Sequence, residues 1–370
     1  MTTAARWRAR VARAWPVAKY VIGLGLAALA FDQLAGHEGE LTEAADALRH
    51  LRWEWVLAGV IVEAGSYLSL VQVQRVLLRA GRVDLALGPM AGITLAANAI
   101  ANSLPAGTAI ATVFSFRQFR RRGADQAIAG WSVLATFVAG AVTLAIVAGV
   151  GAVIAGAEGA SLDLVGPIVG ALAIALVMGA IFVQGRALAW IVATAVRLSR
   201  RLTSWPRDKL AARIGRIVVR LTVVHLSPGK VASALTCAMG NWVLDCSCLA
   251  VSFLAVGAAV PWKGLLLAYG AGQLAANLPI TPGGLGVVEG SLTIALVAFG
   301  GSAASTVAAV LLYRIISFWL TLPLGWGAWA WLEWLARRRP WLAPPAPVGR
   351  SGAQAAGDLP GGDTSEAVTG

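Results

Sequence analysis

Four ionisable side chains lie inside long apolar stretches of the 370-residue chain, where a hydrocarbon environment is expected: Glu63, Asp245, Glu289 and Arg314. A charge at the centre of a membrane costs roughly 3 kcal/mol or more, so such groups are candidates for ion pairs, ligand sites or proton transfer. One arginine among three acids indicates at least one internal ion pair. We expect Glu289 to pair with Arg314, because their segments are consecutive in the chain. The pair could bind a ligand, or it could only fix packing.

Glu289 lies near the end of the stretch NLPITPGGLGVVEG, residues 277–290, which has two prolines and four glycines. A helix that restarts after such a break has N–H groups without helical partners, and its dipole favours an anion. We expect the new helix to start at Pro282, with Glu289 about two turns further along. Glycines there would let a ligand approach the backbone.

A related stretch, ANSLPAG, lies at 101–107 and is expected to start a matching short helix with Thr108, Thr112 and Ser115 along one side. The nearby asparagines could cap freed backbone groups or contact a ligand. The candidate substrate-binding residues are therefore Asn277, Pro279, Pro282, Gly283, Gly284, Gly286, Glu289, Arg314, Asp245, Glu63, Asn98 and Asn102.

Other site chemistries find little support in the residue pattern. The cysteines 237, 246 and 248 share one apolar stretch and the three histidines are far apart, so we expect neither a metal nor another cofactor. The glycine-rich stretch lacks the Lys-Ser/Thr of a phosphate-binding loop. Since the sequence also shows no catalytic motif and no soluble catalytic domain, we do not expect an enzyme.

The composition is that of a membrane protein, because 58% of the residues are hydrophobic and only 13% are charged. The formal net charge of +12 could suggest nucleic acid as a partner, but the basic residues cluster between apolar stretches. Basic clusters in that position set membrane topology and contact anionic lipid. We therefore exclude nucleic acid and expect lipid partners.

The apolar pattern predicts an all-α polytopic membrane protein. Six full crossings are expected at 16–35, 53–75, 126–156, 163–185, 231–259 and 303–335, and two interrupted segments at 88–119 and 264–300. The run that begins near residue 17 follows a basic N-terminus, as in a signal peptide, but its length favours a retained first crossing.

The charges between these segments predict their orientation. Basic residues precede the first crossing and follow the last, so both termini are expected in the cytoplasm of a multi-pass cell-membrane protein. Each interrupted segment then starts and ends on one side, and the two segments enter from opposite faces. We therefore predict two re-entrant hairpins.

The two halves of the chain correspond at an offset of about 177 residues, with 53 matching 231, 88 matching 264 and 126 matching 303. This pattern predicts two inverted-topology repeats, which are typical of secondary transporters with a site at the midplane. The expected organisation is a basic N-terminus at 1–15, a first half at 16–185, an amphipathic basic linker on the inner leaflet at 186–230, a second half at 231–335 and a disordered tail at 336–370.

The motif from Asn277 to Gly290, together with Tyr313-Arg314 in the last crossing, resembles the flippase-like membrane domain of lysylphosphatidylglycerol synthases. The resemblance covers about residues 15–335. In two-domain members that domain is thought to move aminoacylated phosphatidylglycerol between leaflets, whereas a separate soluble domain makes the lipid. No such soluble domain is evident here, so the chain looks like a stand-alone form. The resemblance therefore does not identify which lipid is its substrate.

The resemblance implies translocation of a phospholipid or a polyprenyl-linked headgroup between leaflets. The positions that carry over are Asn277, Pro279, Pro282, Gly283, Gly284, Gly286, Glu289 and Arg314. Two alternatives stay open: a non-catalytic membrane partner of a separate lipid-modifying transferase, and a membrane-embedded transferase that acts on a lipid phosphate.

Overall fold

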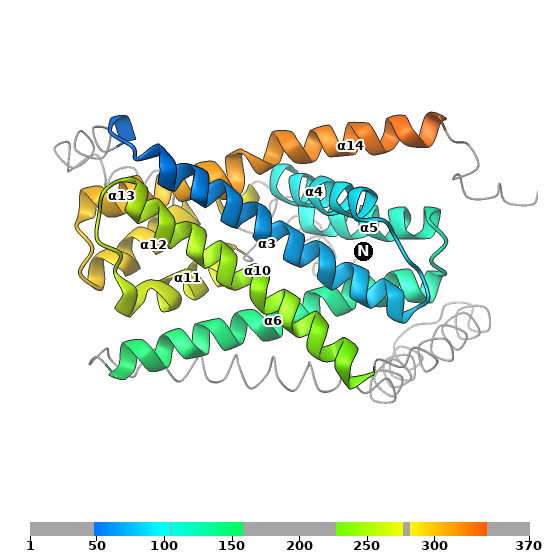
Figure 1. The fold of residues 1–370 in the computed structure, drawn as a ribbon, viewed down its shortest axis with the longest axis horizontal. Helices are drawn as coiled ribbons and strands as arrows, with labels where there is room; N and C mark the ends of the chain where they lie inside the picture. Colours follow the sequence, from blue (N-terminus) through cyan, green and yellow to red (C-terminus); the bar gives the residue numbers. More distant parts are fainter. Residues whose placement is uncertain (1–47, 105, 158–226, 277–281, 339–370) are drawn as a thin grey trace, which may run out of the picture.

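The computed structural model describes residues 48–104, 106–157, 227–276 and 282–338 (Figure 1). All the regular structure in these ranges is helical. The crossings predicted at 16–35 and 163–185 lie outside these ranges. The linker predicted at 186–230 and the tail predicted at 336–370 also lie outside them, except for residue 227 and the helical residues 228–230 and 336–338.

Within these described ranges, four helical stretches are long and apolar enough to cross a membrane. They are α3 (Trp53–Ala80), α6 (Gln126–Ala157), α10 (Pro228–Ala255) and the continuous span Ala303–Arg338. The last span consists of α13 (Ala303–Arg314), the π-helical η3 (Ile315–Trp319) and α14 (Thr321–Arg338). The crossings predicted at 53–75, 126–156, 231–259 and 303–335 are therefore confirmed as long apolar helices.

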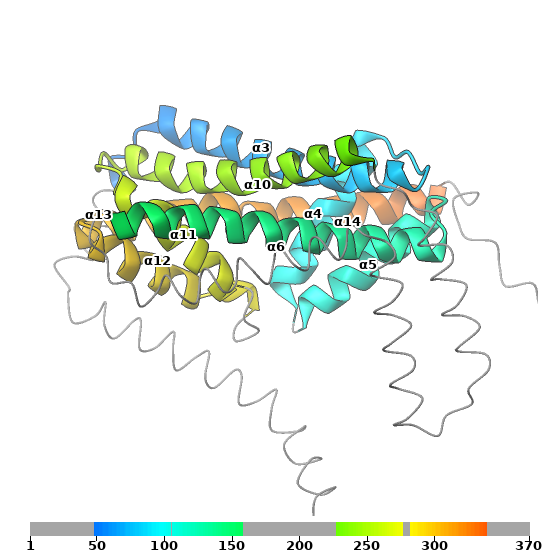
Figure 2. The ribbon, with the colours of Figure 1, turned by 90° about the horizontal axis from the view of Figure 1, so that it is seen from below.

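Helices α3 and α10 lie side by side and run in opposite directions (Figures 1 and 2). Near the start of α3, the Arg52 N–H donates to the Ala255 carbonyl at 2.9 Å. Further along, the Asn241 side-chain amide donates to the Ser66 hydroxyl at 2.7 Å, and that hydroxyl donates to the Asn241 carbonyl at 3.0 Å. Residue numbers rise on one helix as they fall on the other, which fixes the antiparallel register.

Both interrupted segments form pairs of short helices that pack against each other. The first pair is α4 (Leu87–Ser103) and α5 (Gly107–Arg121). The second pair is α11 (Trp262–Ala276) and α12 (Val287–Ala298), with the short 3-10 turn η2 (Pro282–Gly284) before α12. The expectation that a helix starts at Pro282 is wrong, because the positive φ angles of Gly283, Gly284 and Gly286 (63°, 68° and 80°) delay the regular helix to Val287.

The two breaks meet inside the molecule, because η2 packs against α4. Gly283 lies at this contact: a Cβ atom added there would be 3.2 Å from the Asn102 carbonyl oxygen and 2.3 Å from the Phe318 ring. Its positive φ and this close approach both require glycine. The contact therefore brings the second break beside the C-terminal end of α4.

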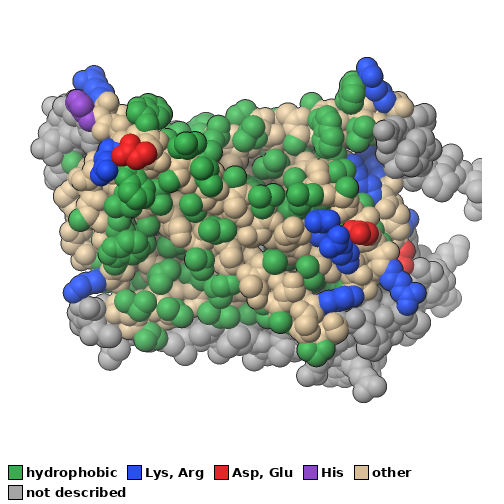
Figure 3. Space-filling model, in the orientation of Figure 1, with side chains coloured by type: hydrophobic (Ala, Val, Ile, Leu, Met, Phe, Trp, Pro, Cys, Tyr) green, Lys and Arg blue, Asp and Glu red, His purple; other side chains and the backbone are tan. Residues whose placement is uncertain are grey.

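The outer surface is rich in apolar side chains, as a lipid-facing surface requires. Figure 3 shows charged side chains toward the two ends of the long axis and mainly hydrophobic or uncharged atoms between them. Tryptophans are prominent on the exposed side of α14: Trp326, Trp329, Trp331 and Trp334. Aromatic side chains of this kind favour the membrane interface.

Candidate functional site

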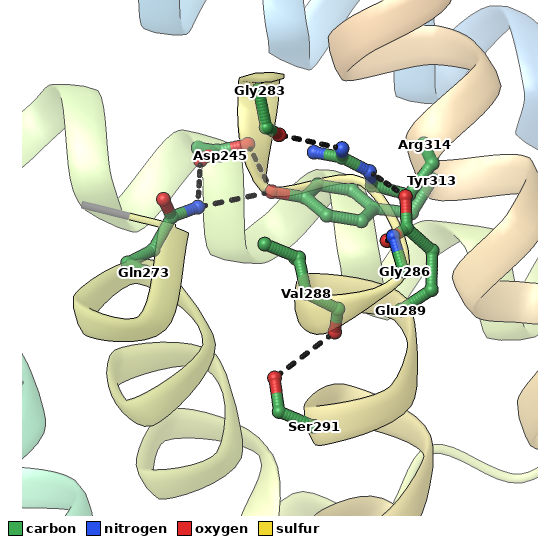
Figure 4. A network of polar contacts seen from close by, with 9 residues as sticks. All are labelled: Asp245, Gln273, Gly283, Gly286, Val288, Glu289, Ser291, Tyr313 and Arg314. Carbon is green, nitrogen blue, oxygen red and sulfur yellow. Dashed lines mark hydrogen bonds and ion pairs between the residues drawn. The ribbon is translucent and has the colours of Figure 1, made fainter. Parts of the chain in front are cut away.

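Arg314 forms the ion pair that the sequence predicts. Its Nε donates to Glu289 Oε1 at 2.6 Å, and its Nη2 donates to the Gly283 carbonyl at 3.0 Å (Figure 4). The guanidinium also lies 4.3 Å from the centre of the Phe318 ring, a cation–π contact. Because Arg314 is only 7% exposed, its charge depends on these partners.

Glu289 also caps the helix in which it lies. Its Oε2 accepts a hydrogen bond from the Gly286 N–H at 2.7 Å, three residues upstream at the start of α12. This carboxylate therefore occupies the helix end at which the sequence predicted an external anion, and Glu289 lies in the first turn of α12 rather than two turns along. The glycines of the break allow it, because they turn the Gly286 N–H toward the helix.

Asp245 on α10 accepts hydrogen bonds from three side chains of two other helices, of which Gln273 and Tyr313 are drawn in Figure 4. Tyr269 and Gln273 of α11 donate to Oδ2 at 2.6 and 3.0 Å, and Tyr313 of α13 donates to Oδ1 at 3.0 Å. Asp245 was predicted as a site residue, but its partners Tyr269 and Gln273 were missed. Their spacing of four residues on an apolar helix was a usable signal, since it places both side chains on one face.

Glu63 on α3 is 6% exposed and interacts directly with Asp245 across the contact between α3 and α10. Its Oε2 is buried and has no hydrogen-bond partner in the part of the chain that the structure describes. The two acids predicted separately on α3 and α10 therefore form one pair, which lies one helical turn from the contact between Ser66 and Asn241.

The first break is surrounded by uncharged polar side chains. Asn98 Nδ2 donates to the Tyr67 hydroxyl at 2.7 Å and to Thr321 Oγ1 at 3.4 Å, and Asn102 Nδ2 donates to Asn98 Oδ1 at 3.1 Å. In these contacts, the side-chain amide of each asparagine donates to other side chains. Tyr67 and Thr321 were not predicted; Tyr67 connects this cluster electrostatically to Glu63.

Four other predicted positions are less informative. Asn277 and Pro279 lie outside the described residues, and Pro282 begins η2. Gly284 is buried; a Cβ added there would lie 2.8 Å from Val288 and 3.2 Å from the Ala276 backbone. Among the described residues, no group of three or more His, Cys, Asp or Glu side chains could hold a metal ion.

Comparison with known proteins connects this arrangement to one family. Residues 17–325 match the family model described as the lysylphosphatidylglycerol synthase TM region. Two proteins of Methanothermobacter thermautotrophicus, each described as a UPF0104 membrane protein, are similar over shorter stretches. One is 41% identical over 80 residues, or 22% of this chain and 23% of the relative. The other is 33% identical over 87 residues, or 23% of this chain and 25% of the relative.

The similar stretches thus span about a quarter of the length of those two relatives. The family match, in contrast, covers both interrupted segments and most of the last span, including Glu289 and Arg314. The four long apolar helices agree with it. The chain is therefore a multi-pass membrane protein that belongs to the lysylphosphatidylglycerol synthase transmembrane-region family.

Proposed function

We propose that the protein moves the polar headgroup of a phospholipid or polyprenyl-linked lipid between membrane leaflets, without catalysing a covalent step. The observation that carries the proposal is the meeting of two helix breaks beside buried charged groups. Irregular backbone at depth is tolerated in membrane proteins where protein or a polar cavity surrounds it, and it commonly forms transport sites.

Arg314 is the group we assign to the lipid phosphate. A guanidinium binds phosphate and carboxylate with the same paired N–H geometry, so a headgroup phosphate could replace Glu289 as its partner. Glu289 would then keep its hydrogen bond to Gly286 and remain with α12. The acyl or prenyl tail would stay in lipid along the apolar outer surface, since only the headgroup needs a polar path.

The antiparallel contact between α3 and α10 supports an inverted repeat, because the first helices of two inverted halves must run in opposite directions. In this proposal the two broken pairs are re-entrant from opposite faces, with both termini in the cytoplasm. The basic linker at 186–230 would then lie on the anionic inner leaflet.

Proteoliposomes that contain fluorescent phospholipids in known leaflets test the proposed function. The wild type should move the labelled lipid at least tenfold faster than protein-free vesicles, and Arg314→Lys and Glu289→Gln should lose most of that rate. Glu333→Gln is the matched control, because Glu333 pairs with Arg121 at 3.3 Å near the surface. Equal rates in wild-type and protein-free vesicles, for phospholipids and a polyprenyl-linked lipid alike, would refute the function.

A further inference from the structure

The contact between α3 and α10 buries the two acidic side chains Glu63 and Asp245 against each other. The antiparallel register of the two helices fixes the position of this acidic pair. Ser66 lies three residues after Glu63, and its partner Asn241 lies four residues before Asp245. Each side chain is thus one turn from that hydrogen-bonded contact, on the same side of it. The pair belongs to the packing of the two helices and cannot separate unless they move apart.

The surrounding donors are unevenly divided between the two acids. Asp245 accepts three hydrogen bonds from Tyr269, Gln273 and Tyr313, whereas Oε2 of Glu63 accepts none among the described residues. An acceptor buried without a donor is destabilising, and more so if it is charged. A positive charge or a proton is therefore needed beside Glu63 to stabilise the pair.

Arg314, the cation that acts on Asp245, does not supply that charge. Arg314 influences Asp245 electrostatically, but its hydrogen bonds go to Glu289 and Gly283. Once Glu289 balances Arg314, two carboxyl groups remain at one buried contact. Two carboxylates that share a site repel each other, and a single proton between them removes the repulsion.

We propose that Glu63 and Asp245 form a coupling-ion site that holds one proton. This inference rests on the proposed function, because it assigns the ion that accompanies headgroup movement. In the closed state the proton is bonded to one carboxyl oxygen and hydrogen-bonded to the other. When it leaves to water, the O–H bond breaks and two carboxylates remain, which favours separation of α3 from α10.

The geometry favours a proton over a metal ion. A cation such as Ca²⁺ or Mg²⁺ takes six or more oxygen ligands, whereas the two carboxyl groups of Asp245 and Glu63 offer at most four. No group of three or more metal-ligating side chains exists among the described residues. A proton needs only two facing oxygens, and burial of Glu63 at 6% exposure means that it can exchange only when the helices part.

Other titratable groups face the pair from each neighbouring helix: Tyr67 on α3, Cys246 and Cys248 on α10, Tyr269 on α11, Glu289 on α12, and Tyr313 and Arg314 on α13. Phenols, thiols and guanidinium groups ordinarily titrate above neutral pH. Glu289 is held by Arg314 and Gly286. We therefore assign proton exchange in this cluster to the two facing carboxyls.

Infrared difference spectroscopy of the full-length protein in lipid nanodiscs tests the site directly. A protonated carboxyl has a C=O stretching band distinct from that of a carboxylate. The wild type should show such a band, which disappears as the pH is raised, and both Glu63→Gln and Asp245→Asn should lack it. Glu333→Gln should keep it. A wild type without the band, a band unchanged in both variants, or a band that sodium alone removes at constant pH would overturn the proposal.

Lipid movement driven by a pH gradient in proteoliposomes separates this proposal from the proposed function. We expect a gradient to change the wild-type rate at least threefold and to have no effect on Glu63→Gln. Size-exclusion profiles that match the wild type show that a variant has folded. A titrating band without lipid movement would refute the function and keep the proton site. Rapid movement that ignores the gradient would keep the function and refute the coupling.

Discussion

The two helix breaks of this molecule have similar sequences but differ in electrostatic character. At the first break, Asn98 and Asn102 form a chain of neutral hydrogen bonds that reaches Tyr67. At the second break, an ionised pair, Glu289 with Arg314, fastens the start of α12 to the last span. A broken helix thus needs polar partners but not charged ones, so the charge at the second break requires a further explanation, which the proposed headgroup ligand would supply.

The difference also concerns which elements each break connects. The neutral cluster joins α3 and α4 to Thr321 in α14, whereas the charged pair joins α12 and η2 to α13. Both reach the span Ala303–Arg338, on either side of η3. That span is therefore the common support of the two breaks, with the neutral contact on one side of the π turn and the charged contact on the other.

The largest effect is expected from Arg314→Met, which would leave the partly buried Glu289 carboxylate without its cation. Breaking a buried pair in this way costs about 3–5 kcal/mol. We expect a strongly lowered unfolding temperature in detergent, or no folded protein. Arg121→Met is the control, since Arg121 forms an exposed pair worth at most about 1 kcal/mol. If Arg314→Met unfolds at the wild-type temperature, the contrast between the two breaks does not hold.

A smaller effect is expected from Gly283→Ala, which alters the contact between the breaks. The new Cβ would meet the Phe318 ring at 2.3 Å, and a positive φ is strained for alanine. Such strain costs about 1–3 kcal/mol. The unfolding temperature of Gly283→Ala is compared with that of Gly88→Ala, where nothing lies within 4 Å of the added atom. Equal stability of these two variants would show that the breaks do not meet closely.

A modest effect is expected from Asn98→Leu at the neutral break. The substitution removes the donor to Tyr67 and leaves Asn102 without its acceptor, a loss of about 1 kcal/mol, because hydrogen bonds between membrane helices are weak. Lipid movement should fall less than in Glu289→Gln, by about threefold at most. A larger loss of movement in Asn98→Leu than in Glu289→Gln would reverse the roles of the breaks.

The smallest effect is expected from Asp84→Asn, outside the spans. The hydrogen bond from Arg79 at 2.9 Å lowers the pKa of Asp84 from its ordinary value. Its contribution to stability is thus present at neutral pH and is lost as the pH falls through that lowered pKa. Because Asp84 is exposed, we expect equal unfolding temperatures for wild type and variant from pH 7 to pH 5. This variant sets the baseline for the other three.

The sequence predicted the elements of the fold well where the signal is local. Long apolar runs gave the four spans, and the Asn, Pro and Gly clusters gave both interruptions, because the cost of unpaired backbone in lipid leaves few alternatives. The pair of Glu289 with Arg314 was also predictable, since consecutive segments usually pack together. The helix start was misplaced because the positive φ angles of Gly283, Gly284 and Gly286 are allowed by glycine but not dictated by it.

The contacts between distant segments were not predictable in the same way. The contact between Glu63 and Asp245 depends on the register of α3 against α10. The distribution of charged residues between the spans predicts only the direction of each helix. A shift of one turn would have placed Glu63 beside Cys248 or Asn241 instead. Tyr67 and Thr321 were missed for a related reason, because hydroxyls are common in membrane helices and become informative only once a partner such as Asn98 is known.

The π-helical segment η3 has a geometric consequence for the last span. A π turn holds one residue more than an α turn, so all side chains after Trp319 are displaced by one residue, or about 100° around the axis. Arg314 and the tryptophans of α14 are therefore out of phase with the pattern of an uninterrupted helix. Conversion of η3 to regular α-helix would turn those tryptophans by that angle and lengthen the span by about 1.5 Å, so this one turn sets where its aromatic end lies in the membrane.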